Sequence, residues 1–234
     1  MKKLLIMAAL AALAGCVSIP SSDTACVVIG MGNSKAYGQC PGSNLDANRM
    51  AEILSNHGKV EKFQDAQATR ANIQSALARG ASKDLLIIYY SGHGGQSGHG
   101  DASEVDKRDE YLCLYDGPMY DNELWAVIQS AKRTMLIIDA CHSETMYRSL
   151  STMATAAHMA GNRGEFLCWS GCPDNTYSYG DDSGGKFTNA IRRNYANYFT
   201  YEQVWKGVAS DKTLAKYQVP KQTKVGSWGG WIFR

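Results

Sequence analysis

Four short runs of apolar residues recur along the chain, and none of them alternates with polar residues. These runs are residues 25–30, 84–90, 134–139 and 165–170. Continuous apolar runs of this length are typical of strands that are covered on both faces of a sheet. We therefore expect four buried strands.

Between the runs, apolar residues follow the spacing of amphipathic helices. Two such sets are Ala47, Met50, Ala51 and Leu54, and Leu124, Val127, Ile128 and Ala131. Shorter patterns of the same period lie at residues 73–77 and 187–191. Asp121 is a suitable N-cap for one helix, and Thr200 with Gln203 predicts a capping box for another. Helices that alternate with strands predict an α/β fold, with a mostly parallel central sheet flanked by helices.

The composition suits one globular domain, because 44% of the 234 residues are hydrophobic and 20% are charged. Two segments rich in Gly, Ser and Asp, residues 92–109 and 173–185, predict long loops, which are often functional. Without Lys2 and Lys3 the 24 basic residues become 22, equal to the 22 acidic ones. A neutral body argues against a nucleic-acid-binding surface.

The first 16 residues, MKKLLIMAALAALAGC, have the form of a secretory leader. The apolar run is too short to span a bilayer permanently. Its end, Leu13-Ala14-Gly15-Cys16, resembles a bacterial lipobox, which implies a signal peptide over 1–15 and a lipid on Cys16. We then expect a tether over 16–24, a folded domain over 25–234, and an exported protein anchored to a membrane. By the same resemblance, the residue after the lipidated cysteine affects sorting, and Val17 rather than Asp at this position favours the outer membrane, facing the periplasm. The alternative is an ordinary signal peptide with a chance cysteine.

The chain has seven cysteines. Cys26, Cys113 and Cys168 lie in apolar runs, which favours small buried thiols. An exported protein permits disulfides, so a pairing of Cys168 with Cys172, or one that involves Cys40, stays open. No CxxC pair occurs, which argues against a structural zinc site.

Two of the expected strands run directly into polar clusters, Ser91-Gly92-His93-Gly94-Gly95 and Asp139-Ala140-Cys141-His142-Ser143. The carboxyl ends of parallel strands meet at one edge of a sheet, so both clusters face one crevice if the strands are neighbours. Cys141 and His93 then make a nucleophile and a base. A nearby imidazolium is expected to lower the pKa of the thiol. The backbone N–H groups of Gly94 and Cys141 are candidates for an oxyanion hole.

The segments YYSGHGG and IIDACHS resemble the His and Cys motifs of caspase and metacaspase peptidases, family C14 of clan CD. His93 and Cys141 are 141 − 93 = 48 residues apart, close to the spacing of about 50 in caspases. Further resemblances follow in order: Gly30-Met31-Gly32, Asn44-Leu45-Asp46-Ala47, Ser170-Gly171-Cys172-Pro173-Asp174-Asn175 and Gly185-Lys186-Phe187-Thr188. The resemblance implies a caspase-like three-layer sandwich and a cysteine endopeptidase that requires no cofactor.

Animal caspases cut after Asp and carry Gln two residues before the nucleophile, where this chain has Asp139. Resemblance to metacaspases implies that Asp46, Ser91 and Asp139 line the S1 pocket. Two carboxylates and a hydroxyl suit Arg or Lys at P1. The alternatives are a charge that favours a helix N-terminus for Asp46 and a structural hydrogen-bond acceptor for Asp139.

Calcium activation is a further implication of the metacaspase resemblance. Asp109 and Asp121 resemble parts of the family's acidic cluster, but Arg148 stands where another Asp is usual. Solvated loop carboxylates are the alternative.

Three functions remain open from the sequence. The first is an endopeptidase whose partners are peptides or proteins with a basic P1 residue, tethered to a membrane by its lipid. The second is a clan relative with another P1 preference, such as Asn. The third is a catalytically silent, lipid-tethered binding module on the same scaffold. The intact pair of His93 and Cys141 argues against the third.

Overall fold

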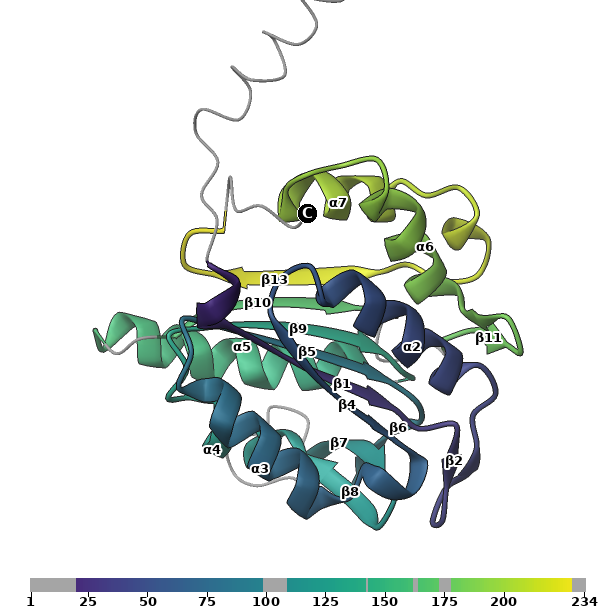
Figure 1. Cartoon of the computed structure of the whole chain (residues 1–234), viewed down its shortest axis with the longest axis horizontal. Helices are drawn as coiled ribbons and strands as arrows, with labels where there is room; N and C mark the ends of the chain where they lie inside the picture. Colours follow the sequence, from purple (N-terminus) through teal and green to yellow (C-terminus); the bar gives the residue numbers. More distant parts are fainter. Residues whose placement is uncertain (1–19, 99–108, 142, 162–163, 173–177, 229–234) are drawn as a thin grey trace, which may run out of the picture.

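The central feature of the protein is a six-stranded sheet with helices on both faces (Figure 1). The computed structural model describes residues 20–98, 109–141, 143–161, 164–172 and 178–228. The strand order is β13-β10-β9-β5-β1-β4. These strands are β1 (Thr24–Gly30), β4 (Lys59–Gln64), β5 (Leu85–Ser91), β9 (Arg133–Asp139), β10 (Glu165–Ser170) and β13 (Lys221–Val225). The predicted three-layer α/β sandwich is confirmed.

All neighbouring strands of this sheet run parallel except β13, which pairs with β10 in the antiparallel direction. The four apolar runs form β1, β5, β9 and β10, with bounds that differ from the prediction by at most one residue. The two edge strands, β4 and β13, were not predicted. Each carries several polar side chains that are at most half-buried, so neither shows the continuous apolar run of a central strand.

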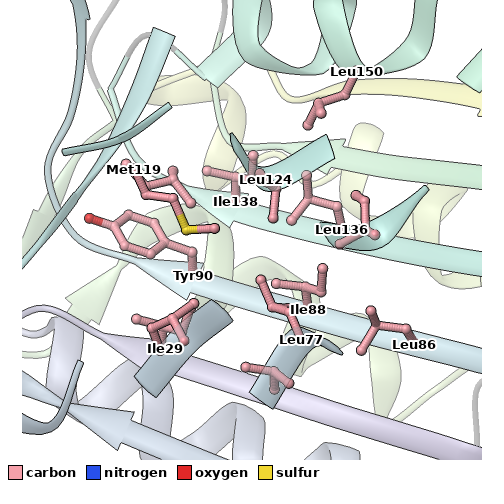
Figure 2. Packing of buried hydrophobic residues seen from close by; sticks show 14 of the residues in the cluster. Ile29, Leu77, Leu86, Ile88, Tyr90, Met119, Leu124, Leu136, Ile138 and Leu150 are labelled. Atoms are coloured by element: carbon pink, nitrogen blue, oxygen red, sulfur yellow. The ribbon is translucent and has the colours of Figure 1, made fainter. Parts of the chain in front are cut away.

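Successive side chains of β5 enter two different hydrophobic clusters. Ile87 and Tyr89 pack under α2 (Ser43–Leu54), α6 (Lys186–Tyr195) and α7 (Tyr201–Ala209). The other face is covered by α3 (Arg70–Ala81), α4 (Asp121–Ile128) and α5 (Ser143–Met159). On that face Leu86, Ile88 and Tyr90 meet side chains of the covering helices, and Figure 2 labels Leu77, Leu124 and Leu150 among them. The period of two along each strand thus fills both layers of the core.

The helix caps test two expectations. Thr200 and Gln203 form the predicted capping box: Gln203 N donates to Thr200 Oγ1 at 3.2 Å, and Thr200 N donates to Gln203 Oε1 at 3.2 Å. The N-cap prediction for Asp121 is wrong, because Asp121 is the first residue of α4 and Tyr120 precedes it as the cap. The Glu123 carboxylate accepts from Tyr120 N at 3.0 Å and takes over the capping role.

Smaller elements occupy segments that were expected to be loops. In the segment 92–109, residues 94–97 form a strand, β6 (Gly94–Ser97), which joins β7 (Asp109–Leu114) and β8 (Gly117–Tyr120) in an antiparallel sheet. At the end of the segment 173–185, β11 (Gly180–Asp181) and β12 (Gly184–Gly185) form a hairpin. The remaining short elements are η1 (Ser21–Asp23), β2 (Asn33–Ser34), β3 (Gly38–Gln39), η2 (Asp65–Gln67) and η3 (Leu214–Lys216). The loop prediction was therefore only partly right.

The six cysteines within the described residues are free thiols, and Cys26, Cys113, Cys168 and Cys172 are buried. Burial raises the pKa of the Cys26 and Cys113 thiols to about 12. The leader, Cys16 and residues 17–19 of the expected tether lie outside the described residues, whereas residues 21–23 of the tether form η1 and Thr24 begins β1. Across the part of the chain that the structure describes, no helix combines the length and apolar composition needed to cross a bilayer.

Candidate active site

The two polar clusters meet at the carboxyl edge of the central sheet. β5 and β9 are neighbours, and Ser91 is the register partner of Asp139. His93 and Cys141 each follow two residues after these strand ends, and both line one cavity of about 160 Å³. The same cavity is lined by Asp46, Ser91 and Asp139. The structure therefore brings the expected pair and the three expected S1 residues to one hollow. Its other lining residues are Gln39, Cys40, Pro41, Ser43, Gly92, Ser178, Tyr179, Gly180 and Gly185.

The backbones of the two clusters pack directly against each other. Gly92 N donates to the Asp139 carbonyl at 3.3 Å. A Cβ atom on Gly94 would lie 2.5 Å from the Cys141 carbonyl oxygen, closer than real Cβ atoms come. Only glycine allows this approach. The two candidate oxyanion donors, Gly94 and Cys141, are therefore on adjoining backbone segments.

The His93 ring is held by a backbone carbonyl from another element. Its Nε2 lies 2.9 Å from the carbonyl oxygen of Gln39, in β3. Since a carbonyl oxygen only accepts, Nε2 carries the proton of this bond, and the neutral ring keeps its lone pair on Nδ1. Tyr90 Oη donates to the His93 carbonyl at 2.6 Å and fixes the backbone as well. Nδ1 is thus the nitrogen left for proton exchange.

The Cys141 thiol contacts the opposite wall of the cavity. Its Sγ donates to the Ser178 carbonyl at 3.9 Å. Burial raises the pKa of the Cys141 thiol above its ordinary value, and the Asp139 charge raises it further. The expected lowering of this pKa is therefore not found. Half-burial beside a carboxylate favours the neutral thiol.

Asp46 sits in the first turn of α2 with an exposed fraction of 1%. Its Oδ2 accepts from Ser91 Oγ at 3.2 Å and from Gly185 N at 2.7 Å. Its buried Oδ1 has no hydrogen-bond partner among the described residues, and Arg49 Nη1 lies 3.9 Å away. Burial first, and the Asp139 charge second, raise the pKa of Asp46 to about 7. The Asp46 side chain thus has one buried carboxylate oxygen without a donor among the described residues.

Both oxygens of the Asp139 side chain, by contrast, accept hydrogen bonds. Ser178 Oγ donates to Oδ1, while Thr188 N at 3.0 Å and Thr188 Oγ1 at 2.7 Å donate to Oδ2. Burial still raises the pKa of Asp139 above its ordinary value, although these bonds oppose the shift. Asp139 is thus a hydrogen-bond acceptor, one of the two interpretations left open by the sequence, and it also lines the cavity.

The N-terminus of α6 points at both carboxylates. Gly185 is its N-cap and donates to Asp46, and Thr188, in its first turn, donates to Asp139. The partial positive charge of a helix N-terminus favours anions there. A Cβ atom on Gly185 would lie 2.1 Å from Asp139 Oδ2 and 3.1 Å from Asp46 Oδ2, so glycine is required between them.

The sequence did not single out several residues of the site. Gln39 contributes a backbone carbonyl, which leaves no signature in a residue pattern, and Ser178, which contributes its carbonyl and its hydroxyl, is a single serine in a loop-like segment. Gly185 and Thr188 belong to the quoted segment Gly185-Lys186-Phe187-Thr188, so a signal was present, but it gave no role to either residue.

The two candidate calcium ligands do not line this cavity. Asp109 begins β7, and Asp121 is buried at the start of α4, where its Oδ1 accepts from Asn122 N at 2.6 Å. No group of three His, Cys, Asp or Glu side chains that could hold a metal ion occurs among the residues described.

Comparison with known proteins decides the family. The caspase-domain model of the C14 peptidases matches residues 23–224. This chain belongs to the caspase-domain family of cysteine peptidases. The membership agrees with the resemblance carried by the segments around His93 and Cys141.

Metacaspases are among the similar curated proteins. Metacaspase-1 of Saccharomyces cerevisiae is 36% identical over 143 residues, which cover 51% of this chain and 33% of the relative. Metacaspase-3 of Arabidopsis thaliana is 28% identical over 150 residues, which cover 53% of this chain and 41% of the relative. The aligned part thus spans about a third to two fifths of these relatives.

A solved structure supports the fold. The crystal structure of protein GSU0716 from Geobacter sulfurreducens superposes with a TM-score of 0.70, covering 87% of this chain and 94% of that one. Its sequence identity of 24% makes this a likeness of fold alone.

Proposed function

We propose that the protein is a cysteine endopeptidase that cleaves after Arg or Lys. The observation that carries the proposal is a single cavity lined by a thiol, an imidazole and two buried carboxylates, Cys141, His93, Asp46 and Asp139. The thiol and imidazole supply a nucleophile and a proton carrier. The carboxylates supply a site for a cationic side chain.

Asp46 and Asp139 are expected to contribute differently to the binding of a P1 cation. Asp46 Oδ1 is buried and has no described hydrogen-bond donor, so the charge of Asp46 is less compensated than that of Asp139 and attracts a P1 cation. Asp139 already accepts at both oxygens, so it acts mainly through its charge. We therefore assign the less compensated charge to Asp46 and the hydrogen-bonded charge to Asp139, with the Ser91 hydroxyl orienting Asp46.

The chemistry follows from the hydrogen bonds of the catalytic pair. His93 Nδ1 takes the proton of the Cys141 thiol as the sulfur attacks the scissile carbonyl carbon. The imidazolium then passes this proton to the leaving amine, and an acyl-enzyme on Cys141 remains. Water, deprotonated by the same nitrogen, releases the acid and restores the thiol. The bond from Nε2 to the Gln39 carbonyl holds the ring in place during these proton transfers.

The proposed oxyanion donors are the backbone N–H groups of Gly94 and Cys141. Their segments adjoin, as the space at Gly94 shows. Two fixed donors aimed at the developing negative charge lower the barrier of acyl transfer. This mechanism uses no cofactor. Calcium activation through Asp109 and Asp121 remains a prediction, tested by comparing cleavage in calcium with cleavage in EGTA.

We further propose that the protein is exported and anchored through a lipid on Cys16. The support is the leader and the lipobox-like residues Leu13 to Cys16. Cys16→Ser is expected to release the protein from the membrane fraction and to abolish incorporation of labelled fatty acid. Retention of both properties by this variant would contradict the anchor.

A series of fluorogenic peptides with Arg, Lys, Asn or Asp at P1 tests the function. We expect the wild type to cleave after Arg and Lys, and we expect the Cys141→Ala variant to lose this cleavage. Cys141-dependent cleavage after Asn instead would favour the clan relative with another preference. A lack of Cys141-dependent cleavage across the series would favour the silent binding module.

A further inference from the structure

A buried glutamine that does not line the cavity hydrogen-bonds three residues beside it. Gln218 lies just before β13, has an exposed fraction of 5%, and does not line the cavity. Its Nε2 donates to the Gly171 carbonyl at 2.8 Å and to Ser178 Oγ at 3.3 Å. Its Oε1 accepts from Tyr179 N at 2.8 Å. The carboxamide therefore uses both of its hydrogens and its oxygen on two neighbouring segments.

The first segment fixes the glutamine itself. Gly171 follows β10, and its own N donates to the Ile138 carbonyl at 2.9 Å, next to Asp139. A Cβ atom on Gly171 would lie 3.1 Å from Gln218 Nε2 and 3.4 Å from Asp139 Oδ1. Gln218 is thus fastened to the end of the central sheet, close to the floor of the cavity.

The second segment is the cavity wall that Gln218 holds in place. Ser178 contacts both the S1 floor and the nucleophile: its Oγ donates to Asp139 Oδ1, and its carbonyl accepts from Cys141 Sγ. Tyr179 beside it lines the cavity and is 47% exposed. Gln218 hydrogen-bonds both Ser178 and Tyr179, and it also hydrogen-bonds Gly171 at the end of β10. Its side chain therefore links this wall of the cavity to the central sheet.

We propose that Gln218 is a positioning residue for P1 specificity, which acts by holding Ser178 against Asp139. The inference rests on the proposed function. When the carboxamide is lost, the wall loses its link to Gly171, and Ser178 no longer holds its hydroxyl on Asp139. Asp139 then loses a donor that favours its charged form, and the pocket binds a cationic side chain less tightly.

The test compares Gln218→Glu with Gln67→Glu, a control at an exposed position of η2. Glu keeps the length of the side chain and an oxygen for Tyr179 N, but it removes both donors. Gln218→Met, which removes all three bonds, is the second variant in case a buried carboxylate prevents folding. For either Gln218 variant we expect KM for a P1-Arg peptide to rise about tenfold, with kcat per titrated site changed less than about twofold.

A second measurement does not depend on turnover. Calorimetry follows acetyl-arginine amide, with uncharged acetyl-citrulline amide as control, binding to Cys141→Ala with and without the Gln218 change. We expect the Kd of the arginine ligand to rise by the same factor as KM. A variant that is only less stable has a lower melting temperature and fewer titratable sites but an unchanged KM.

The outcomes separate this inference from the function on which it rests. Active wild type with unchanged KM and Kd in both Gln218 variants would overturn the positioning role and leave the peptidase proposal intact. A wild type that neither cleaves P1-Arg peptides nor, as Cys141→Ala, binds acetyl-arginine amide would overturn both.

Discussion

Asp46→Asn separates the charge of the S1 pocket from its shape. The amide oxygen can accept from Ser91 Oγ and Gly185 N, as Asp46 Oδ2 does, while the amide nitrogen takes the place of the oxygen that has no described donor. The substitution therefore keeps the hydrogen bonds and removes the charge. We expect it to stabilise the fold above neutral pH and to abolish most of the affinity for P1-Arg.

The magnitude follows from the pKa of Asp46. The folded protein raises this pKa from 3.8 to about 7, so the charged form is disfavoured by roughly 4 kcal/mol once both states are ionised. The sign is that of a raised carboxyl pKa: folding favours the protonated form, and stability falls as pH rises from about 4 to about 7. Burial of an unpaired amide nitrogen offsets about 1–3 kcal/mol of the gain. A net stabilisation of about 1–3 kcal/mol at pH 8 remains.

The assay is urea unfolding of the wild type and Asp46→Asn at pH 4.5 and pH 8. We expect the advantage of the variant to appear at pH 8 and to shrink or reverse at pH 4.5, where wild-type Asp46 is neutral when folded. Loss of the charged acceptor should lower kcat/KM for P1-Arg by about 10- to 100-fold. An Asn variant that is equally stable or less stable at pH 8, or that cleaves P1-Arg normally, would refute the reasoning.

Two further substitutions test the walls of the site. Gly94→Ala should lower kcat/KM at least tenfold by steric conflict with the Cys141 carbonyl, and normal kinetics would contradict the close approach. Thr188→Val removes a hydroxyl that contacts Asp139 at 2.7 Å and Tyr89 Oη at 2.6 Å, so we expect a loss of about 1–3 kcal/mol in urea unfolding; an unchanged midpoint would count against that network.

The central strands could be predicted because burial on both faces leaves a continuous apolar run. The edge strand β13, KQTKV, carries no such run, and its pairing with β10 depends on the rest of the fold. The helix α5 was not predicted, although its sequence carries an amphipathic pattern. Met146, Leu150 and Ala154 are buried at a spacing of four residues, which an amphipathic pattern could have revealed.

Some residues of the candidate site could also be predicted from the sequence, and others could not. His93 and Cys141 could be paired because each follows a strand end in a distinctive segment. Gln39 acts through its backbone carbonyl, and Ser178 and Gln218 are single polar residues outside any motif that was given a role, so no local pattern marks them. The raised pKa of Cys141 depends on burial by distant segments, which the sequence motif alone did not reveal.

Covalent labelling tests whether Cys141 is a nucleophile beside an acidic S1 pocket. A peptide chloromethyl ketone with P1 Arg, and its citrulline counterpart as control, would be incubated with the folded protein, and the adduct located by mass spectrometry. We expect rapid labelling of Cys141 by the Arg reagent, slow labelling by the citrulline reagent, and no adduct in a His93→Ala variant under the same conditions. Labelling that spares Cys141, or that is equally fast with both reagents, would contradict a nucleophile beside an acidic S1 pocket.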